Sequence, residues 1–140
     1  MDRATFDDYI ARFNAQDYTT FDDHLAQDFH CLNGQLEIVG IDGFKAHYAT
    51  IWRTFREELE VSRWVGDDET IAIRMRTHFT ALHDDLQSLF GPVREGHSFD
   101  FYGVIMYELV EERFSRIQVA YNSFTSTAPD GAITELGIPH

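Results

Sequence analysis

The residues best suited to chemistry stand on one segment near the middle of the chain. Over positions 70–82, mostly apolar side chains occupy the odd positions, whereas the even positions include Arg76 and His78. This alternation predicts a strand with one apolar and one cationic face. If the cationic face lines a pocket, His78 is the best candidate general acid or base, because imidazole titrates nearest to neutral pH, and Arg76 is a candidate substrate-binding residue. In the alternative, this face meets solvent or a second copy of the chain, as is common in antiparallel sheets.

A partner for His78 is expected on the next predicted strand, which carries Asp100 and Tyr102. If that pairing begins with Leu82 opposite Ser98, His78 faces Tyr102, and Asp100 lies two positions along. Asp100 would then orient the imidazole as the second catalytic residue. The phenol of Tyr102 would polarise a substrate carbonyl group.

The last predicted strand supplies two further candidates for substrate binding. A two-residue turn at Glu111-Glu112 pairs the final strands so that Tyr102 meets Tyr121, whereas a one-residue bulge brings Asn122 to that place. Both Tyr121 and Asn122 could bind a substrate oxygen.

The signals for metal and cofactor sites are weak. His78 and His83 are five positions apart, so they point to opposite faces of a strand and are poorly placed to share a metal ion. The sequence has neither a glycine-rich phosphate loop nor a Cys-x-x-Cys pair, and its one cysteine is Cys31. We therefore expect no metal site and no cofactor.

Three helices are expected to precede the long strands. Apolar residues at helical spacing and a capping pattern predict helices over residues 5–15 and 20–28. A turn signal at Asn33-Gly34 indicates a strand or hairpin over residues 29–39. A third helix is expected to run from Asp42 to Arg56. Its core face carries two candidate substrate-binding aromatic residues, for which packing is the simpler role: Tyr48 and Trp52.

Four extended segments follow, and turn signals between them predict an antiparallel sheet. The segments cover residues 58–65, 70–82, 98–109 and 114–124. Helices followed by strands are typical of an α+β fold with the helices on one face of the sheet. The 83–97 connection is expected to be a long loop, and its apolar residues could close over the mouth of a pocket.

Composition narrows the class of protein. The chain has 140 residues, 44% of them hydrophobic, which fits one domain with a sizeable core. Its net charge of −13 makes nucleic acids and anionic membranes poor partners. No apolar segment is long enough to cross a membrane, and the first residues do not resemble a signal peptide, so we expect a cytoplasmic protein.

The order of the predicted elements resembles the nuclear-transport-factor-2-like cone fold, in particular its SnoaL-like branch. The resemblance is carried by residues 11–17, by the Gly40–Phe44 segment that opens the third helix, by residues 66–73 at the central hairpin, and by Glu135-Leu136-Gly137 in the tail. It implies a single domain over residues 1–140, with 126–140 as a C-terminal tail. The implied fold is a cone-shaped α+β barrel in which a curved antiparallel sheet packs on three N-terminal helices and encloses an apolar cavity, commonly as a homodimer.

The resemblance also restricts the reaction. Epoxide hydrolases of this fold carry an Arg-x-Asp pair where this chain has Arg76-Thr77-His78, and SnoaL-like cyclases place an aspartate near the segment 121–125, which here has no carboxylate. The expected function is a cofactor-independent lyase, isomerase or cyclase that transfers protons on an apolar polyketide- or terpenoid-like molecule. The alternative is a non-catalytic small-molecule binding or dimerisation module of the same fold.

Overall fold

Three helices lie at the N-terminal end of the chain in the computed structural model, which describes residues 1–137. They are α1 (Arg3–Asn14), α2 (Thr19–His24) and α3 (Gly40–Trp52). Helix α1 forms because four apolar side chains recur on one face and become buried, and because the Asp2 side chain accepts a hydrogen bond from the Thr5 backbone N–H at 2.8 Å. The cap is therefore Asp2, and α1 begins two residues before the predicted start.

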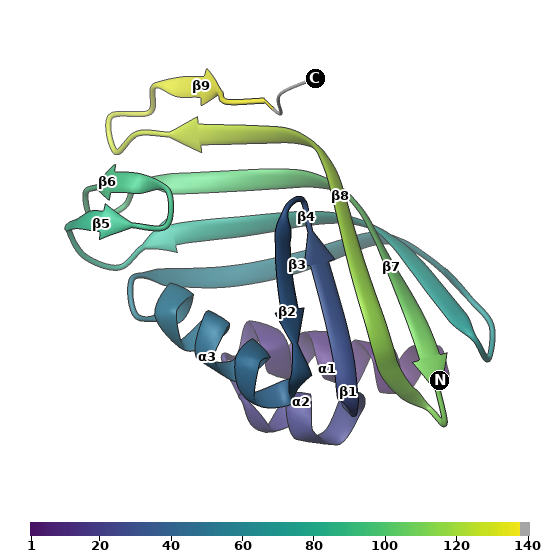
Figure 1. Ribbon diagram of the computed structural model, residues 1–140. Helices are drawn as coiled ribbons and strands as arrows, with labels where there is room; N and C mark the ends of the chain where they lie inside the picture. Colours follow the sequence, from purple (N-terminus) through teal and green to yellow (C-terminus); the bar gives the residue numbers. More distant parts are fainter. Residues whose placement is uncertain (138–140) are drawn as a thin grey trace.

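A seven-stranded sheet curves over these helices (Figure 1). Its strands are β1 (Leu25–Asn33), β2 (Leu36–Val39), β3 (Phe55–Gly66), β4 (Thr70–Ala81), β7 (Ser98–Val110), β8 (Arg113–Thr127) and β9 (Ile133–Glu135). The main order is β2-β1-β8-β7-β4-β3, with β9 paired to β8. The four long strands pair antiparallel as predicted, whereas β1 lies parallel to β8. The predicted α+β fold, a curved sheet on three helices, is confirmed, but the sheet does not close into a barrel.

The register of β4 and β7 differs from the prediction by two residues. His78 lies opposite Asp100 and Arg76 lies opposite Tyr102. Two bulges between β7 and β8 shift the register by one residue each. Tyr102 therefore faces Ser123 and neither of the predicted partners. One bulge lies at Gly103, where an added Cβ atom would stand 2.5 Å from the Tyr121 Cα atom. Only glycine allows the two strands to approach this closely.

The 83–97 connection contains a hairpin that is separate from the large sheet. Its strands are β5 (Asp85–Ser88) and β6 (Gly91–Val93). The carboxylate of Asp85 accepts a hydrogen bond from the Thr54 hydroxyl at 2.7 Å, and the ring centroid of Phe90 lies 5.3 Å from that of Phe55. These contacts hold the β5–β6 hairpin against the end of the sheet.

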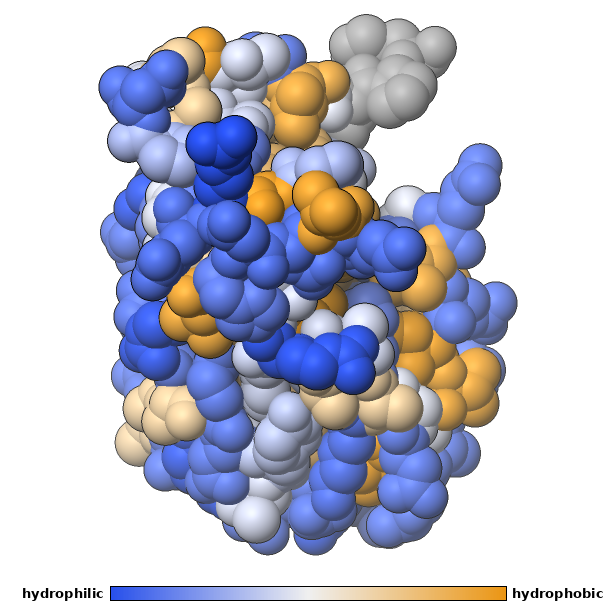
Figure 2. Space-filling model, turned by 90° about the vertical axis from the view of Figure 1, so that its left-hand side faces the viewer, coloured by the Kyte–Doolittle hydropathy of each residue, from blue (hydrophilic) through white to orange (hydrophobic). Residues whose placement is uncertain are grey.

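On the face shown in Figure 2, apolar residues appear as separate groups between hydrophilic ones.

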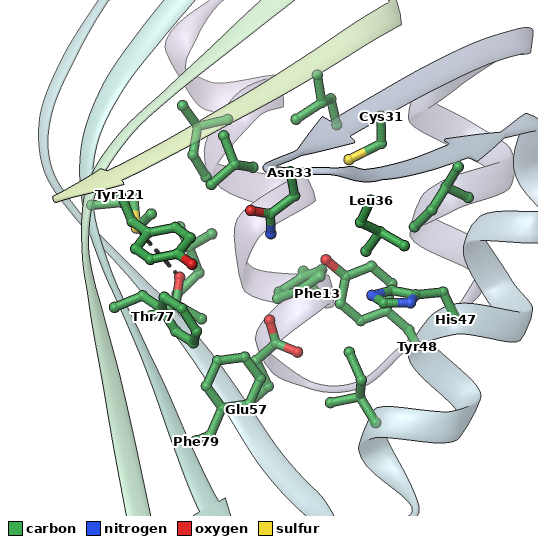
Figure 3. A pocket seen from close by; sticks show the side chains of 18 of the residues that line it. Phe13, Cys31, Asn33, Leu36, His47, Tyr48, Glu57, Thr77, Phe79 and Tyr121 are labelled. Carbon is green, nitrogen blue, oxygen red and sulfur yellow. Dashed lines mark hydrogen bonds between the residues drawn. The ribbon is translucent and has the colours of Figure 1, made fainter. Parts of the chain in front are cut away.

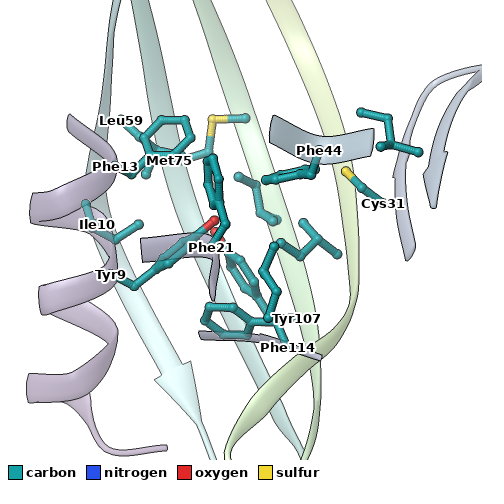
Figure 4. Packing of buried hydrophobic residues seen from close by; sticks show 14 of the residues in the cluster. Tyr9, Ile10, Phe13, Phe21, Cys31, Phe44, Leu59, Met75, Tyr107 and Phe114 are labelled. Atoms are coloured by element: carbon teal, nitrogen blue, oxygen red, sulfur yellow. The ribbon is translucent and has the colours of Figure 1, made fainter. Parts of the chain in front are cut away.

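The main core lies between the helices and the concave face of the sheet (Figure 4). Along β4, the odd residues Ile71, Ile73, Met75 and Phe79 are buried there. The concave face is therefore the apolar one, and the face that carries Arg76 is the outer one. Among residues 1–137, no helix is long and apolar enough to cross a membrane.

The C-terminal tail returns along β8. Strand β9 pairs with residues 125–127, and the Glu135 carboxylate accepts hydrogen bonds from the Ser123 hydroxyl at 2.8 Å and the Phe124 backbone N–H at 3.0 Å. The last three residues of the expected tail, 138–140, lie outside the described residues.

Candidate functional site

A cavity of about 150 Å³ lies between the concave face of the sheet and the helices. Most of its walls are aromatic or aliphatic. Polar side chains also line it, and they come from β1, α3, β3, β4 and β8 (Figure 3): Asn33, His47, Tyr48, Glu57, Thr77 and Tyr121. Two lining residues, Leu36 and Leu89, are exposed and mark the side on which the cavity opens. A concave, mostly apolar space with a few polar groups is typical of small-molecule sites.

Glu57 is the most unusual of these residues. It stands on β3 between Phe55 and Leu59 on the inward-facing side, is only 3% exposed, and points its carboxyl group into the cavity (Figure 3). Burial raises the pKa of Glu57 to about 8, and a hydrogen bond from the Trp52 indole to Oε1 at 3.2 Å partly offsets this. A carboxyl group with this pKa is mainly protonated at pH 7 and keeps a minor carboxylate fraction, so it can donate a proton and, when ionised, accept one.

The backbone around Glu57 is held by two amide side chains at the end of α1 and just beyond it. The Gln16 amide accepts from the Glu57 backbone N–H at 3.2 Å and donates to its carbonyl oxygen at 3.3 Å. Asn14 makes the same pair of hydrogen bonds with Leu59, at 2.7 and 3.0 Å. These amides make the backbone hydrogen bonds that a neighbouring strand would make at the edge of β3, and they fix Glu57 in place.

Two residues of α3 lie near Glu57 at the cavity. Tyr48 contacts Phe13, with ring centroids 5.2 Å apart, and burial together with the charge of Glu57 raises the pKa of its phenol well above the usual value. Burial lowers the pKa of His47, so this imidazole is neutral near pH 7. Within residues 1–137, the side chains of Tyr48, Tyr121 and Asn33 form no hydrogen bonds. Their polar atoms are therefore free to bind a ligand.

The predicted substrate-binding residues divide between the two faces of the sheet. Tyr48 and Tyr121 line the cavity, while Trp52 is buried behind it and contacts Glu57. Tyr102 and Asn122 lie outside, along a surface hollow over β4, β7 and β8. Arg76 also lies on the outer face, so three of the six expected residues are on that face and only two line the cavity.

The predicted catalytic residues are together, but on the outer face. Oδ1 of Asp100 accepts hydrogen bonds from His78 Nδ1 and Arg76 Nε, both at 2.8 Å, and Asp100 is only 7% exposed. The other ring nitrogen of His78 lies 3.2 Å from the Thr80 hydroxyl. The predicted association of His78 with Asp100 is therefore present. The condition for its catalytic role, that the cationic face lines the cavity, is not met.

Sequence reasoning missed Glu57 because the strand was expected to begin at residue 58, three residues after the start of β3. The signal is the alternation of residues 55–61, in which a glutamate occupies the same face as Phe55, Leu59 and Val61. A carboxylate at an apolar position is costly, so it points to a function.

The cavity shows no features of a metal site. Within the part of the chain that the structure describes, no three His, Cys, Asp or Glu residues are grouped to hold an ion. Cys31 is buried in the cavity wall, and burial raises the pKa of its thiol to about 12, so it remains a neutral, small apolar group.

Comparison with known proteins identifies a family and several solved structures of the same fold. Residues 6–117 match the family described as a SnoaL-like domain. A candidate polyketide cyclase from Xanthomonas campestris pv. campestris superimposes with a TM-score of 0.70 at 17% identity, covering 84% of this chain and 88% of that one. A candidate polyketide cyclase from Pseudomonas putida KT2440 gives 0.68 at 24% identity, with coverage of 84% and 89%.

An epoxide hydrolase from M. tuberculosis, described as LEH-like, also shares the fold. Its TM-score is 0.67 at 13% identity, and the alignment covers 84% of this chain and 80% of that one. The search of curated proteins finds no match to this chain. At these identities, the structural similarity shows the fold alone.

Proposed function

Because the chain belongs to the SnoaL-like domain family, we propose that it is a small-molecule enzyme that transfers a proton on an apolar substrate held in the cavity, without a cofactor. The observation that carries the proposal is Glu57, a buried carboxyl group that faces an apolar cavity. A polar group is retained in such surroundings at a cost to stability, which a catalytic role explains.

Glu57 is suited to both directions of proton transfer. As a neutral acid, it donates its proton to an oxygen of the substrate. As a carboxylate, it takes a proton from a carbon next to a carbonyl group, the C–H electron pair becomes a carbon–carbon double bond, and the carbonyl oxygen becomes an enolate oxygen. Dehydration, isomerisation and cyclisation of polyketide- or terpenoid-like molecules share such a step.

The phenols that face the cavity support the same chemistry. Tyr48 and Tyr121 line it and have no hydrogen-bond partner among residues 1–137. Either hydroxyl can donate to an oxygen on which negative charge develops. The low polarity of the walls strengthens that hydrogen bond.

The proposal is tested with a simple ketone before the natural substrate is known. We expect the protein to accelerate exchange of the hydrogens beside the carbonyl group of cyclohexanone for deuterium in D₂O, as followed by NMR. Glu57→Gln should lower the rate by roughly 100-fold or more, the usual contribution of a general base. Glu58→Gln is the matched control, because Glu58 is exposed and its carboxylate pairs with Arg56.

A non-catalytic binding module is the competing function. It predicts that cyclohexanone binds but exchanges no faster than in buffer, and that Glu57→Gln changes nothing. Exchange that is equally fast in both glutamine variants would also overturn the catalytic proposal.

We further propose that two copies associate through the outer face of the sheet. Three large apolar side chains on the outer side of β7 are exposed there: Tyr102, Val104 and Met106. Burying them would remove apolar area from water. In such a dimer, the cluster of His78 and Asp100 would support the interface.

A further inference from the structure

We infer that the ligand of the cavity is a neutral molecule with a single ring and at least one hydrogen-bonding oxygen, and that molecules with three fused rings are excluded. This inference rests on the proposed function, since it concerns the same cavity. It narrows the polyketide- or terpenoid-like class to its smallest members.

The first argument is volume. The cavity measures about 150 Å³. An apolar cavity of about this size in another protein holds one benzene molecule, so one ring with a short substituent fills the space. A three-ring molecule needs a much larger cavity.

The second argument is the rigidity of the walls, because a small cavity could widen if its side chains were loose. On the side toward the β5–β6 hairpin, Phe90 packs between Phe79 and Phe101, with ring centroids 5.2 and 5.8 Å apart. Phe101 in turn stacks on Phe124 at 4.1 Å. Rotating any one ring would disturb the next, so enlarging the cavity means breaking several packed contacts.

The opposite side is closed in the same way. Phe13 lies 5.2 Å from Tyr48 and 6.3 Å from Tyr9, measured between ring centroids, and the group belongs to the main core. Aromatic clusters thus form the cavity wall on the hairpin side and on the side of Phe13 and Tyr48, while the cavity opens at Leu36 and Leu89.

The third argument is charge. No lysine or arginine lies among the residues that line the cavity within residues 1–137. Its two groups that titrate near neutrality, Glu57 and His47, have their charged forms disfavoured by burial. An anionic ligand would lose its hydration and find no positive charge, and a cationic one would meet a Glu57 that is mainly neutral at pH 7, so either charge is costly to bury. The ligand is therefore neutral.

The fourth argument is the placement of polar groups. The Glu57 carboxyl group, the Tyr121 hydroxyl and the Asn33 amide point into the cavity from different strands (Figure 3). A hydrocarbon would leave these groups unsatisfied, at a free-energy cost for each one. A ligand oxygen, as in a ketone, alcohol or epoxide, can bind to them.

Isothermal titration calorimetry with matched methyl ketones tests the inference. Acetophenone has one ring, and 9-acetylphenanthrene presents the same ketone on three fused rings. We expect acetophenone to bind, and the three-ring ketone to bind at least about tenfold more weakly because it must open the cavity wall. Benzoate, nearly the same shape as acetophenone but anionic, should bind at least about tenfold more weakly at about pH 7.

Two variants of β4 show whether binding occurs in the cavity. Thr77 lines the cavity and Thr80 lies on the opposite face of the strand, so Thr77→Phe should abolish binding of acetophenone and Thr80→Phe should not. Equal or tighter binding of the three-ring ketone or of benzoate would overturn the inference. Failure of acetophenone to bind, or loss of its binding in Thr80→Phe alone, would do so as well.

Failure of this inference differs from failure of the proposed function. Selective binding of acetophenone, with no exchange of cyclohexanone hydrogens, supports the ligand class and rejects the enzyme. Exchange that depends on Glu57, with tight binding of the three-ring ketone, rejects the ligand class and keeps the enzyme.

Discussion

The indole nitrogen of Trp52 donates a hydrogen bond to Oε1 of Glu57 at 3.2 Å. Trp52 is the last residue of α3 and Glu57 is the third residue of β3, so the short connection between these elements creates the contact. Within residues 1–137, Oε2 of Glu57 accepts no hydrogen bond. When Glu57 is neutral, its proton therefore lies on Oε2, the oxygen that remains available to a ligand in the cavity.

Removing the indole N–H should change the pH dependence of the proposed reaction. The hydrogen bond from Trp52 lowers the pKa of Glu57, so Trp52→Phe should raise that pKa above its value of about 8. The midpoint of the rate of cyclohexanone exchange against pH should move upward by up to about one unit. Trp64→Phe is the control, because Trp64 lies near the other end of β3, where it packs against Phe6, and does not contact Glu57. A midpoint unchanged in Trp52→Phe would mean that the hydrogen bond does not tune the acid.

Glu57 should also make the folded protein less stable as the pH rises. The unfolded chain ionises Glu57 near its ordinary pKa of 4.5, whereas the folded protein keeps the proton until about pH 8. Between these values the folded state holds more protons, so stability is greatest at the low end and is lost as the pH increases. Glu57→Gln should remove this loss, which is on the order of 4 kcal/mol.

Urea unfolding of both proteins between pH 5 and pH 9 measures the difference. The histidines also titrate in this window, among them His83 with a pKa raised from 6.5 and His47 with a pKa lowered from it, but both proteins carry them, so their effect cancels in the difference. A constant difference between the two proteins at every pH would show that Glu57 ionises normally.

Replacing His78 tests the catalytic role predicted from the sequence. Because His78 lies on the outer face beside Asp100, His78→Ala should leave the rate of cyclohexanone exchange unchanged. It should instead lower stability by about 1–3 kcal/mol, since the nearly buried Asp100 loses one of its two hydrogen bonds. A large loss of exchange with the fold intact would restore His78 as the catalytic residue.

The proposed dimer depends on the apolar strip of β7. Val104 is 52% exposed in the isolated chain, and a carboxylate at its position would be buried between two copies. Size-exclusion chromatography with light scattering should give twice 16.2 kDa for the wild type and 16.2 kDa for Val104→Glu. Val39→Glu, on the edge strand β2 and similarly exposed, should leave the dimer intact. A wild-type protein of 16.2 kDa would reject the dimer.

Much of the fold was predictable because its elements follow local patterns. The spacing of Phe6, Tyr9, Ile10 and Phe13 predicts α1, and the strict alternation of residues 70–82 predicts β4 and both of its faces. The pairing of β1 with β8 was not predictable, since parallel strands far apart in sequence leave no turn signal. The bulges were also not predictable from the sequence, because they depend on the close approach of the two strands at Gly103.

The site was less accessible to sequence reasoning, for a physical reason. Alternation separates the two faces of a strand but does not say which one covers the helices. His78 attracted attention because its ordinary pKa lies near 7, whereas Glu57 acquires its unusual pKa only through burial in the folded chain. The sequence gives only the ordinary pKa of a side chain, and burial in the folded chain can shift that pKa by several units.

The β5–β6 hairpin suggests how new specificities could be engineered. Leu89 and Phe90 form part of the cavity wall, yet they belong to a small sheet that is not hydrogen-bonded into the large one. Grafting a hairpin of different length or with smaller tip residues would reshape one wall while the strand that carries Glu57 keeps its place. In this chain, an exchangeable hairpin thus lies beside the fixed position of Glu57.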